Sequence, residues 1–485
     1  MSVAKTKSSD KPCAAEILAA GEQLRQLADQ LQGFVNSAAQ EGESFDKVER
    51  SVFRSVLEIG KSAMALFVSL QGHGDLGPSV NTEDDKRLIR SDQSSMSTVR
   101  SIFGIHKFEE FTYSAGKKKA VQLRPVSARM SLPGHRWSLL LQEFSQMLCV
   151  DQTYDQAMSN LSCIFGGDFS VDSAEPVNSE MGIMAAKFLD QLPVPDAESE
   201  GHLLVASLDC KGVPLVKKDM PRVAAFETPK KQKGNRRMAT VATVYSVNRF
   251  HRMPEEVLSG LFRDPKEDRT RQTRPRPQNK HTTAHFPELE DDGEGGQLPI
   301  TGVHVGTAWA MEEVGRRWRP EQTLVVLIDG QQSLWDTVGM YLEFNGRTVP
   351  ILDILHVASY VWSAAKLFEQ DEGTRKQFTR LRLARILNGE VHAVILGLRQ
   401  LATRRQLKGD SRQQLEQICS YFAKNAERMR YREYLALGYP IASGAVEGAC
   451  GHLVKDRMER SGMRWTLEGA GAMPECVNDF GTTAC

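Results

Sequence analysis

Residues 203–212, read as LLVASLDCKG, deliver a single carboxylate, Asp209, at the end of a short apolar run. A run of this length, followed by a Gly-Val-Pro segment, is typical of a strand buried on both faces. An Asp at the end of such a strand is a candidate for a functional site, but an Asp shortly before a Gly is also a common turn composition. By its own sequence the stretch favours a turn, so the rest of the chain has to decide.

Composition places the chain among ordinary globular proteins. It has 485 residues, of which 41% are hydrophobic and 25% are charged, and a chain of this length predicts about two to four domains. No apolar run approaches the roughly 18 to 20 uncharged residues that a membrane span needs, and no apolar core follows the N-terminal lysines. We therefore expect no membrane segment and no signal peptide, and a cytoplasmic location.

The cysteines and the charges exclude some kinds of site. Eight cysteines are scattered without any Cys-x-x-Cys pair, which argues against structural zinc and against a disulfide framework. The formal net charge is zero, so total charge does not indicate a nucleic-acid partner. Basic residues nevertheless gather just after the Asp209 strand, either as a DNA-contacting loop or as an ordinary solvated loop: Lys217, Lys218, Arg222, Lys230, Lys231, Lys233, Arg236 and Arg237.

The first part of the chain predicts helices and then a hairpin. Apolar side chains at three- and four-residue steps predict helices over 14–39 and 44–70, which we expect to pack within the N-terminal region, with a dimer contact as the alternative. Residues 73–84 are rich in Gly, Ser and Pro and read as a linker. The pattern of residues 99–124 predicts a hairpin turned by Gly116, whose tip presents three lysines: Lys117, Lys118 and Lys119.

A helical region follows. Residues 138–150 have a buried-helix pattern, and the segments on either side of Gly166, Gly167 and Asp168 predict a helix, a turn and a second helix over 153–190. Such an arrangement can place its second helix in the major groove of DNA. A plain helical hairpin gives the same pattern, so both interpretations remain open.

Beyond a polar boundary at 193–201 the chain becomes rich in strands. Residues 238–250 alternate as an antiparallel strand does, whereas residues 263–297 contain almost no apolar side chains and are expected to form an excursion or a disordered loop. A helix over 304–318 then leads to TLVVLIDG, a second apolar run that ends in a carboxylate, Asp329. The pattern of an apolar run followed by an Asp therefore occurs a second time.

The remaining elements supply further polar groups. A helix over 333–342 precedes a strand that ends in Asp353, with His356 three residues later and a helix after it. Residues 373–435 are helical and rich in arginine. The last predicted helix begins after a Pro/Ser/Gly turn and carries Glu447.

Acids at the ends of neighbouring strands meet at one edge of a sheet. Asp209, Asp329 and Glu447 could be gathered in this way, and oxygen-only clusters suit Mg²⁺ or Mn²⁺. Two such ions about 3.5 to 4 Å apart can activate water or a 3′-hydroxyl and stabilise the leaving oxygen of a phosphodiester. Asn or Gln would lack the negative charge that holds the ions.

The order of these elements is that of a ribonuclease-H-like domain interrupted by a helical insertion. The motifs SLDCKGVPL, VVLIDGQQSLW, ILDILHVASYVW and YPIASGAVEGACGHLVKDRMERSGMRW resemble those of bacterial insertion-sequence transposases of the DDE class, most closely the Kra-type (ISKra) family and more distantly Mutator-like transposases. The likeness covers about residues 99–470, and the last motif is long and specific.

The resemblance implies a multidomain α plus α/β protein. Its expected domains are a helical N-terminal region at 1–98, a DNA-binding domain with a helix-turn-helix at 99–195, a mixed-sheet, ribonuclease-H-like catalytic domain that begins at 196–372, an all-helical insertion at 373–436 and a closing part at 437–485. In the family the tail continues as apolar helix, whereas residues 469–485 lose periodicity after Met473. This departure indicates an altered or shifted reading frame.

The resemblance also implies roles for individual residues. Asp209, Asp329 and Glu447 match the triad that binds two Mg²⁺ or Mn²⁺ ions. Asp353 and His356 match an Asp-x-x-His signature, in which His356 is either catalytic or structural. Asp219 and Asp336 match no catalytic position and are expected on the surface. The residues expected to contact DNA are Lys117, Lys118, Lys119, Lys230, Lys231, Lys233, Arg236, Arg237, Lys455 and Arg457.

The implied activity is that of a transposase. Such a protein binds the terminal inverted repeats of its element and target double-stranded DNA as a homodimer or higher oligomer, in the nucleoid-associated bacterial cytoplasm, and cleaves and joins strands. Two alternatives remain. One is a ribonuclease-H-like nuclease that cuts without joining, and the other is a catalytically inactive protein that binds element ends.

Overall fold

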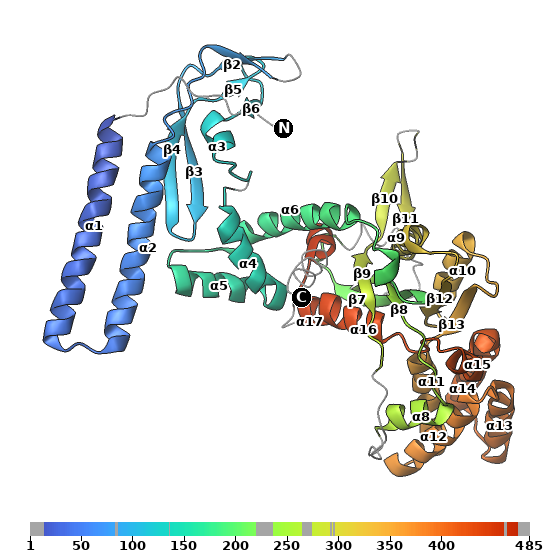
Figure 1. Cartoon of the computed structure of the whole chain (residues 1–485). Coiled ribbons are helices and arrows are strands. Elements are labelled where there is room, and N and C mark those ends of the chain that lie inside the picture. The colour runs from blue at the N-terminus through green and yellow to red at the C-terminus, as the bar shows by residue number, and fades with distance from the viewer. Residues whose placement is uncertain are drawn as a thin grey trace. The chain divides into compact units, whose positions relative to one another are not determined.

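The computed structural model describes residues 14–82, 86–134, 136–219, 236–263, 274–291, 293, 296–459 and 463–473. The chain divides into two compact units, Met1–Glu180 and Met181–Cys485. The fold is of the mixed α and β type, with a helical N-terminal region and a mixed sheet in the second unit (Figure 1). None of the described helices combines the length and apolarity that crossing a membrane requires.

The two N-terminal helices that the sequence predicted are present, and they form a hairpin. Helix α1 (Ala14–Glu41) packs along α2 (Phe45–Ser69) (Figure 1). The turn between them uses Gly42, whose φ of 67° is a left-handed conformation that glycine adopts without strain. The apolar row of α1 is only half-buried. Helix α2 also contacts the neighbouring β-hairpin, so the expected packing within the N-terminal region is present.

Two small sheets complete the β part of the first unit. One has the order β1 (Ser79–Asn81), β2 (Arg87–Arg90), β5 (Tyr113–Ser114) and β6 (Val121–Leu123), and the other is the hairpin of β3 (Ser95–Ser101) and β4 (Gly104–Glu110). The predicted hairpin over 99–124 is therefore wrong in extent, because only the short β5–β6 turn contains Gly116. The expected boundary at residue 98 falls inside β3.

The predicted linker at 73–84 is also wrong, because the segment is held in the sheet. Strand β1 lies within it and pairs with β2. The buried Tyr113 hydroxyl donates a hydrogen bond to the Gly77 carbonyl at 2.9 Å and accepts one from the Leu76 amide at 2.8 Å. A tertiary contact with a residue far along the chain thus orders a stretch whose composition alone indicates flexibility.

Helices α3 (Pro125–Arg129), α4 (Leu139–Asp151), α5 (Tyr154–Phe165) and α6 (Val171–Asp190) follow. The predicted helix, turn and helix over 153–190 are confirmed. The Thr153 hydroxyl caps α5 by accepting a hydrogen bond from the Gln156 amide at 3.1 Å. Gly166 and Gly167 have φ values of 73° and 83°, which explains the glycine pair at the turn.

The second unit is built on a five-stranded sheet. Its strand order is β13 (Thr348–Leu352), β12 (Thr323–Ile328), β7 (Leu203–Pro214), β8 (Arg236–Val247) and β9 (Gln278–His285). Strand β12 is parallel to both β13 and β7, whereas β7–β8 and β8–β9 are antiparallel. Because β7 continues to Pro214, Asp209 lies within a strand rather than at its end, which corrects the sequence interpretation.

Strand β9 lies in the stretch 263–297, which is expected from the sequence to form an excursion or a disordered loop. The expectation of disorder is wrong for residues 278–285 and 288–291, which form β9 and β10 (Glu288–Asp291). Strand β10 pairs with β11 (Gln297–Ile300), which begins at the last residue of that stretch. Strand β9 is polar, but Thr282, Thr283 and Ala284 are buried against β8. The hydroxyls of Thr243 and Thr282 lie 3.3 Å apart. Threonine packs well on a pleated surface although it does not count as apolar.

Helices cover both faces of this sheet. Leu204, Ala206 and Leu208 point towards α9 (Gly302–Arg317) and α10 (Gln332–Tyr341), whereas Leu203 and Val205 point towards α11 (Ile354–Phe368) and the helices after it. The alternation follows from the period of two along a strand. The run at 203–208 is apolar throughout because both faces are covered. A short helix, α8 (Pro254–Phe262), packs into the core on the face of Leu203 and Val205.

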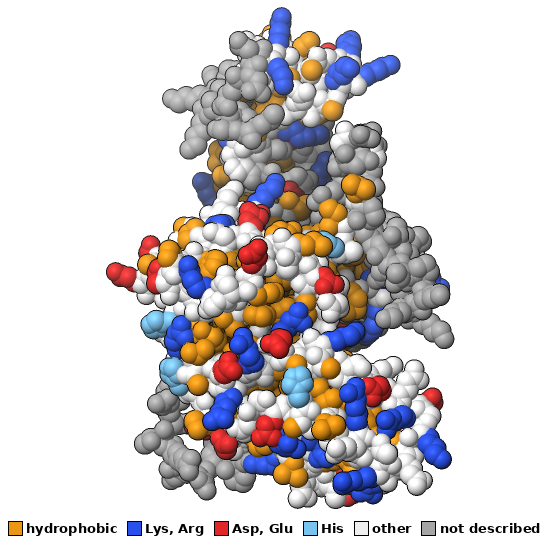
Figure 2. Space-filling model, turned by 90° about the vertical axis from the view of Figure 1, so that its right-hand side faces the viewer, with side chains coloured by type: hydrophobic (Ala, Val, Ile, Leu, Met, Phe, Trp, Pro, Cys, Tyr) orange, Lys and Arg blue, Asp and Glu red, His pale blue; other side chains and the backbone are white. Residues whose placement is uncertain are grey.

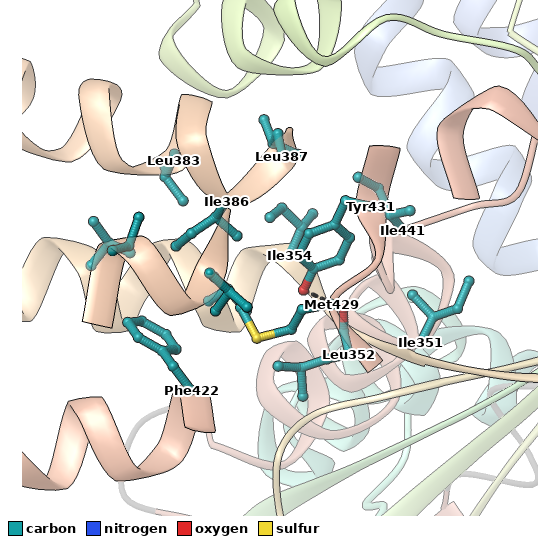
Figure 3. Packing of buried hydrophobic residues seen from close by; sticks show 14 of the residues in the cluster. Ile351, Leu352, Ile354, Leu383, Ile386, Leu387, Phe422, Met429, Tyr431 and Ile441 are labelled. Carbon is teal, nitrogen blue, oxygen red and sulfur yellow. Dashed lines mark hydrogen bonds between the residues drawn. The ribbon is translucent and has the colours of Figure 1, made fainter. Parts of the chain in front are cut away.

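The segment 373–436 is helical, as expected. It contains α12 (Glu372–Leu387), α13 (Val391–Arg404), α14 (Gly409–Asn425) and α15 (Tyr431–Ala436). Figure 3 shows its apolar side chains packed around Ile354 and Leu352, with the Tyr431 hydroxyl donating a 2.8 Å hydrogen bond to the Leu352 carbonyl. The insertion thus shares one core with the sheet.

The chain then returns to the sheet. Helix α16 (Gly444–Ala449) continues into a π-helical segment, Cys450–Lys455, and α17 (Asp456–Met458). Beyond it, Trp465 pairs with the end of β7, because its amide donates to the Pro214 carbonyl at 3.0 Å. The atypical tail predicted after Met473 lies outside the described residues.

Candidate metal centre

Strand register brings the first two acids together. Ala206 of β7 is paired with Val326 of β12 in a parallel ladder, and Asp209 and Asp329 each follow their paired residue by three positions. Both acids therefore lie at the same level of the sheet, where β12 ends beside the middle of β7. The carboxylate of Asp329 accepts a hydrogen bond from the Gln331 amide at 2.8 Å, a local turn that orients it. One oxygen of Asp209 accepts from the Cys210 amide at 2.8 Å.

His356 connects these acids to Glu447. In the first turn of α11, its Nδ1 lies 3.8 Å from a carboxylate oxygen of Asp329, and its Nε2 lies 3.9 Å from one of Glu447. Ligand atoms of Asp209, Asp329 and His356 all lie within 4.8 Å of one another, as do those of Asp353, His356 and Glu447. The three acids and the histidine of the sequence prediction thus belong to one cluster, and these groups could hold a metal ion.

Asp353 is buried behind the cluster and holds the helix of Glu447. Its side chain accepts hydrogen bonds from the Ser443 hydroxyl at 2.6 Å and from the Ser443 amide at 3.2 Å. It also caps α11 through the Leu355 amide at 3.1 Å. Because Ser443 directly precedes α16, Asp353 ties the start of the Glu447 helix to the end of β13. We regard Asp353 as a positioning residue.

The electrostatics of the cluster favour a bound cation. Burial raises the pKa of Asp329, and the charges of Asp209 and Asp353 add to this effect. Burial also raises the pKa of Glu447, again with contributions from Asp353 and Asp209, whereas His356 opposes the rise. Negative charge is thus concentrated where solvent is partly excluded. The donor set is carboxylate oxygen with one imidazole, which fits a hard or borderline divalent ion such as Mg²⁺ or Mn²⁺.

Two residues of the centre were missed in the sequence although signals for them existed. Lys211 lowers the pKa of Glu447, and it lies two residues after Asp209, on the same face of β7 by strand periodicity. The Cys450 thiol donates to the second oxygen of Asp209 at 3.4 Å, and it lies three residues after Glu447, on the same helix face. Burial raises the pKa of Cys450, so it remains a thiol and a donor.

A third missed contact has no signal in the sequence. Tyr421 of α14 packs so closely against Gly330 that a Cβ at residue 330 would lie 2.1 Å from its ring. The Tyr421 ring stacks on Tyr360 of α11, with ring centroids 4.0 Å apart. The helical insertion therefore contacts the residue next to Asp329 and packs against the turn at residues 329–331.

The predicted DNA-contacting residues have different environments. Lys117, Lys118 and Lys119 are exposed in the β5–β6 turn, and Lys455 is exposed on the π-helical segment. Arg236 is exposed and pairs with Glu459 at 2.5 Å. Figure 2 shows Lys and Arg side chains interspersed with Asp and Glu over much of one face, not gathered into one basic patch.

The prediction of DNA contact is wrong for two arginines, because they are buried. Arg457 is 1% exposed and stacks on Trp465, with its guanidinium carbon 4.8 Å from the ring centroid. Arg237 is 5% exposed and donates to the Arg236 carbonyl at 2.8 Å. Neither can reach a DNA phosphate. Lys230, Lys231 and Lys233 lie outside the described residues.

Of the two acids expected on the surface, only Asp336 is exposed. Asp219 is buried, and its carboxylate accepts a 2.9 Å hydrogen bond from the Leu467 amide. It therefore joins the chain after β7 to the last described segment. The prediction of a surface position for Asp219 is wrong, because the partner segment lies far away in the sequence.

The charge of the helix-turn-helix is unfavourable for phosphate contact. Helix α6 carries Asp172, Glu175, Glu180 and Asp190 but only Lys187 as a basic residue. A helix that enters a groove normally has basic or neutral polar side chains towards the phosphates. The predicted use of this pair in recognising DNA therefore stays a prediction.

Comparison with known proteins found no matching protein-family model and no matching curated sequence.

Proposed function

We propose that the chain is a DNA transposase of the DDE class, whose second unit is a ribonuclease-H-like catalytic domain. The observation that carries the proposal is the convergence of Asp209, Asp329, His356 and Glu447 from β7, the end of β12, α11 and α16. Because these residues lie far apart in the sequence, a structural role for each acid alone does not explain their meeting.

The topology supports the same proposal. The order of elements runs from β7 with Asp209 through β8, β9, α9 and β12 with Asp329, then α10, β13 and α11, and reaches Glu447 after the helical insertion. This is the order expected of a ribonuclease-H-like domain with an insertion. Double-stranded DNA, as element ends and target, is the proposed partner, and a homodimer or higher oligomer is the proposed form on DNA.

The residues of the centre have distinct tasks in the proposed reaction. When bound, two Mg²⁺ or Mn²⁺ ions would supply the activation of the attacking oxygen and the stabilisation of the leaving oxygen. Asp209, Asp329 and Glu447 would hold them by charge, and Asp353 and Ser443 keep Glu447 in register. His356 lies between two carboxylates, where its imidazole is placed to serve as a further ligand.

The test is strand cleavage and joining by the purified full chain. The substrate is a linear duplex that carries the DNA bordering the coding sequence, incubated with Mg²⁺ and target plasmid. We expect nicked and joined products, and a loss of at least about a hundredfold in Asp209→Asn and Asp329→Asn, which remove charge at the centre. Asp336→Asn, an exposed acid outside the cluster, is the matched control and should retain activity. Full activity in Asp209→Asn would refute the assignment.

A nuclease without strand transfer is the second candidate. It is favoured by the fact that the acid cluster accounts for phosphodiester hydrolysis, whereas joining rests on the resemblance to transposases. The same incubation separates the two, because a nuclease gives cut products in Mg²⁺ but no joined molecules. Binding without any Mg²⁺-dependent cleavage would instead indicate an inactive protein that binds element ends.

A further inference from the structure

A cavity of about 420 Å³ lies beside the Glu447 helix. Tyr245 of β8, the segment of Phe250 and Arg252, and residues 274–277 form its walls, and Gly444 and Ala445 of α16 close one side. Tyr245 is paired with Val205 and Val241 with Asp209, so the cavity opens on the sheet face that carries Asp209.

The frame of the cavity is held by contacts between distant segments. The Phe250 amide donates to the Gly438 carbonyl at 2.9 Å, and the Arg252 Nη2 donates to the Tyr439 carbonyl at 3.0 Å. Gly438 has a φ of 75°, and a Cβ there would lie 2.8 Å from the Phe250 amide nitrogen. The close approach of the two segments therefore requires glycine, and the site is built rather than incidental.

One nitrogen of the Arg252 side chain, Nε, lacks a hydrogen-bond acceptor among the described residues. This nitrogen is buried, and the guanidinium carbon of Arg252 lies 5.6 Å from the centroid of the Phe250 ring. Burial and the charge of Arg274 lower the pKa of Arg252 to about 10, with Glu256 as the opposing acid. The group still carries its charge at neutral pH. Its Nη2 donates to the Tyr439 carbonyl, but no carboxylate pairs with it among the described residues, and burying a charge without a counter-ion is costly. An anion in the cavity would lower that cost.

The remaining lining residues supply groups that suit the phosphate and the base of a nucleotide. Arg274 and Arg276 are exposed at the wall, and guanidinium groups match phosphate oxygens in charge and shape. Phe250 lines the same cavity, beside Tyr245, which is 4% exposed, and an aromatic face accepts a base by stacking. Cations beside aromatic rings favour a phosphate joined to a planar ring over a simple inorganic ion.

We propose that this cavity binds one nucleotide, with its phosphate at Arg252, Arg274 and Arg276 and its base against Phe250. The assignment to a substrate strand rests on the proposed function. Gly444 and Ala445 lie within one turn of Glu447 on α16, roughly 5 Å along the helix. One to two nucleotide steps at about 3.4 Å each along a strand cover that distance. The cavity then holds a nucleotide close to the bond that is cut.

The test measures binding without cleavage. A fluorescent single-stranded oligodeoxynucleotide is titrated with the full chain in EDTA. Arg274→Ala/Arg276→Ala should weaken binding by about tenfold, the loss expected for charged hydrogen bonds to phosphate. Arg404→Ala/Arg405→Ala, which removes the same charge from two exposed arginines at the C-terminal end of α13, is the matched control and should change affinity less than about twofold. Equal losses in both variants would overturn the proposal.

Competition identifies the source of the nucleotide. If the cavity takes a strand, unlabelled oligodeoxynucleotide displaces the probe at far lower concentration than deoxyadenosine monophosphate. If the mononucleotide competes as well as the oligonucleotide, the cavity serves a free nucleotide and the substrate-strand assignment fails. Inorganic phosphate that competes equally with the mononucleotide refutes the base subsite. Because EDTA prevents metal-dependent cleavage, a chain that binds but never cuts refutes the transposase and leaves the cavity proposal standing.

Discussion

At the scale of single residues, Asp353 shows how a buried acid can serve a site that it does not enter. It is fully buried, and its closest partner is the Ser443 hydroxyl at 2.6 Å. The segment that leads into α16 is also held by the bond from the Ile354 amide to the Ile441 carbonyl at 2.9 Å and by burial of Ile441, but the Ser443 hydroxyl makes the shortest contact next to α16. The position of Glu447 therefore depends on a contact formed behind it.

Ser443→Ala tests this role. Loss of a hydrogen bond to a buried charged group should lower the free energy of unfolding by about 1 to 3 kcal/mol, and it should raise the Mg²⁺ concentration needed for half-maximal cleavage because Glu447 is less well held. Chemical denaturation and a Mg²⁺ titration of cleavage measure the two effects. Ser443→Thr retains the hydroxyl and should restore both. An unchanged Mg²⁺ requirement in a destabilised Ser443→Ala variant would limit Asp353 to a purely structural role.

Gly330→Ala tests the contact with Tyr421. The new Cβ would lie 2.1 Å from a ring that is stacked on Tyr360, so the ring has to shift, and overpacking of this kind should cost about 1 to 3 kcal/mol of stability. Gly339→Ala is the matched control, because nothing lies within 4 Å of its Cβ and it occupies the interior of α10, where alanine favours helix. Thermal unfolding of both variants measures the difference. Equal melting temperatures would contradict the close approach.

At the scale of elements, β9 is a strand that its polar composition did not predict. Its polar side chains include His285, whose ring lies 6.4 Å from that of Trp309 in α9. Burial lowers the pKa of His285 to about 4. The packing of α9 on this strand therefore has a titratable group within it, which makes the docking of β9 sensitive to pH.

This burial predicts loss of stability in mild acid. A histidine whose pKa is lower in the folded chain than in the unfolded chain stabilises the fold above its unfolded pKa of about 6.5, and that contribution is lost as the pH falls towards the folded pKa. Between pH 7 and pH 5 we expect a loss of about 1 to 2 kcal/mol from His285. Urea unfolding of the wild type and of His285→Gln at both pH values measures it. The proton-linked share should disappear in His285→Gln, and an identical pH dependence in both chains would contradict this assignment.

At the scale of the whole molecule, the proposed metal centre predicts that stability depends on divalent ions. Burial raises the pKa values of Asp329 and Glu447, and the charges of Asp209 and Asp353 add to the rise of each. A cation bound by these groups in the folded chain would offset the repulsion from Asp209 and Asp353. The proposal therefore links the unfolding equilibrium to Mg²⁺ or Mn²⁺.

Mg²⁺ should raise the melting temperature of the full chain. At a concentration one hundred times the dissociation constant, binding adds about 2.7 kcal/mol to the free energy of unfolding. Asp329→Asn keeps the acceptor for the Gln331 amide but loses the charge, so it should be at least as stable as the wild type in EDTA and should lose most of the Mg²⁺ effect. Differential scanning calorimetry with and without Mg²⁺ measures both. A full Mg²⁺ shift in this variant would show that the ion binds elsewhere.

Local sequence patterns determined the helices and the paired Asp strands, because periodicity and capping act over a few neighbouring residues. The helices on either side of Gly166 and Gly167, the apolar runs before Asp209 and Asp329, and the helix after Asp353 could all be read directly. Strand β9 and the segment that contains β1 could not be read from the sequence, since Thr282 is buried by β8 and Leu76 is held by Tyr113. These segments are ordered by contacts with residues far along the chain.

The candidate site divides in the same way. The sequence by itself singled out Asp209, Asp329, His356 and Glu447 as candidates, by their residue types and by the apolar runs and helix starts beside them. Only the tertiary structure decided that they meet, that Asp353 and Tyr421 support them from behind, and that Arg237 and Arg457 are buried. The physical reason is that exposure and distance depend on strand register and on the packing of the helical insertion, which no local pattern encodes.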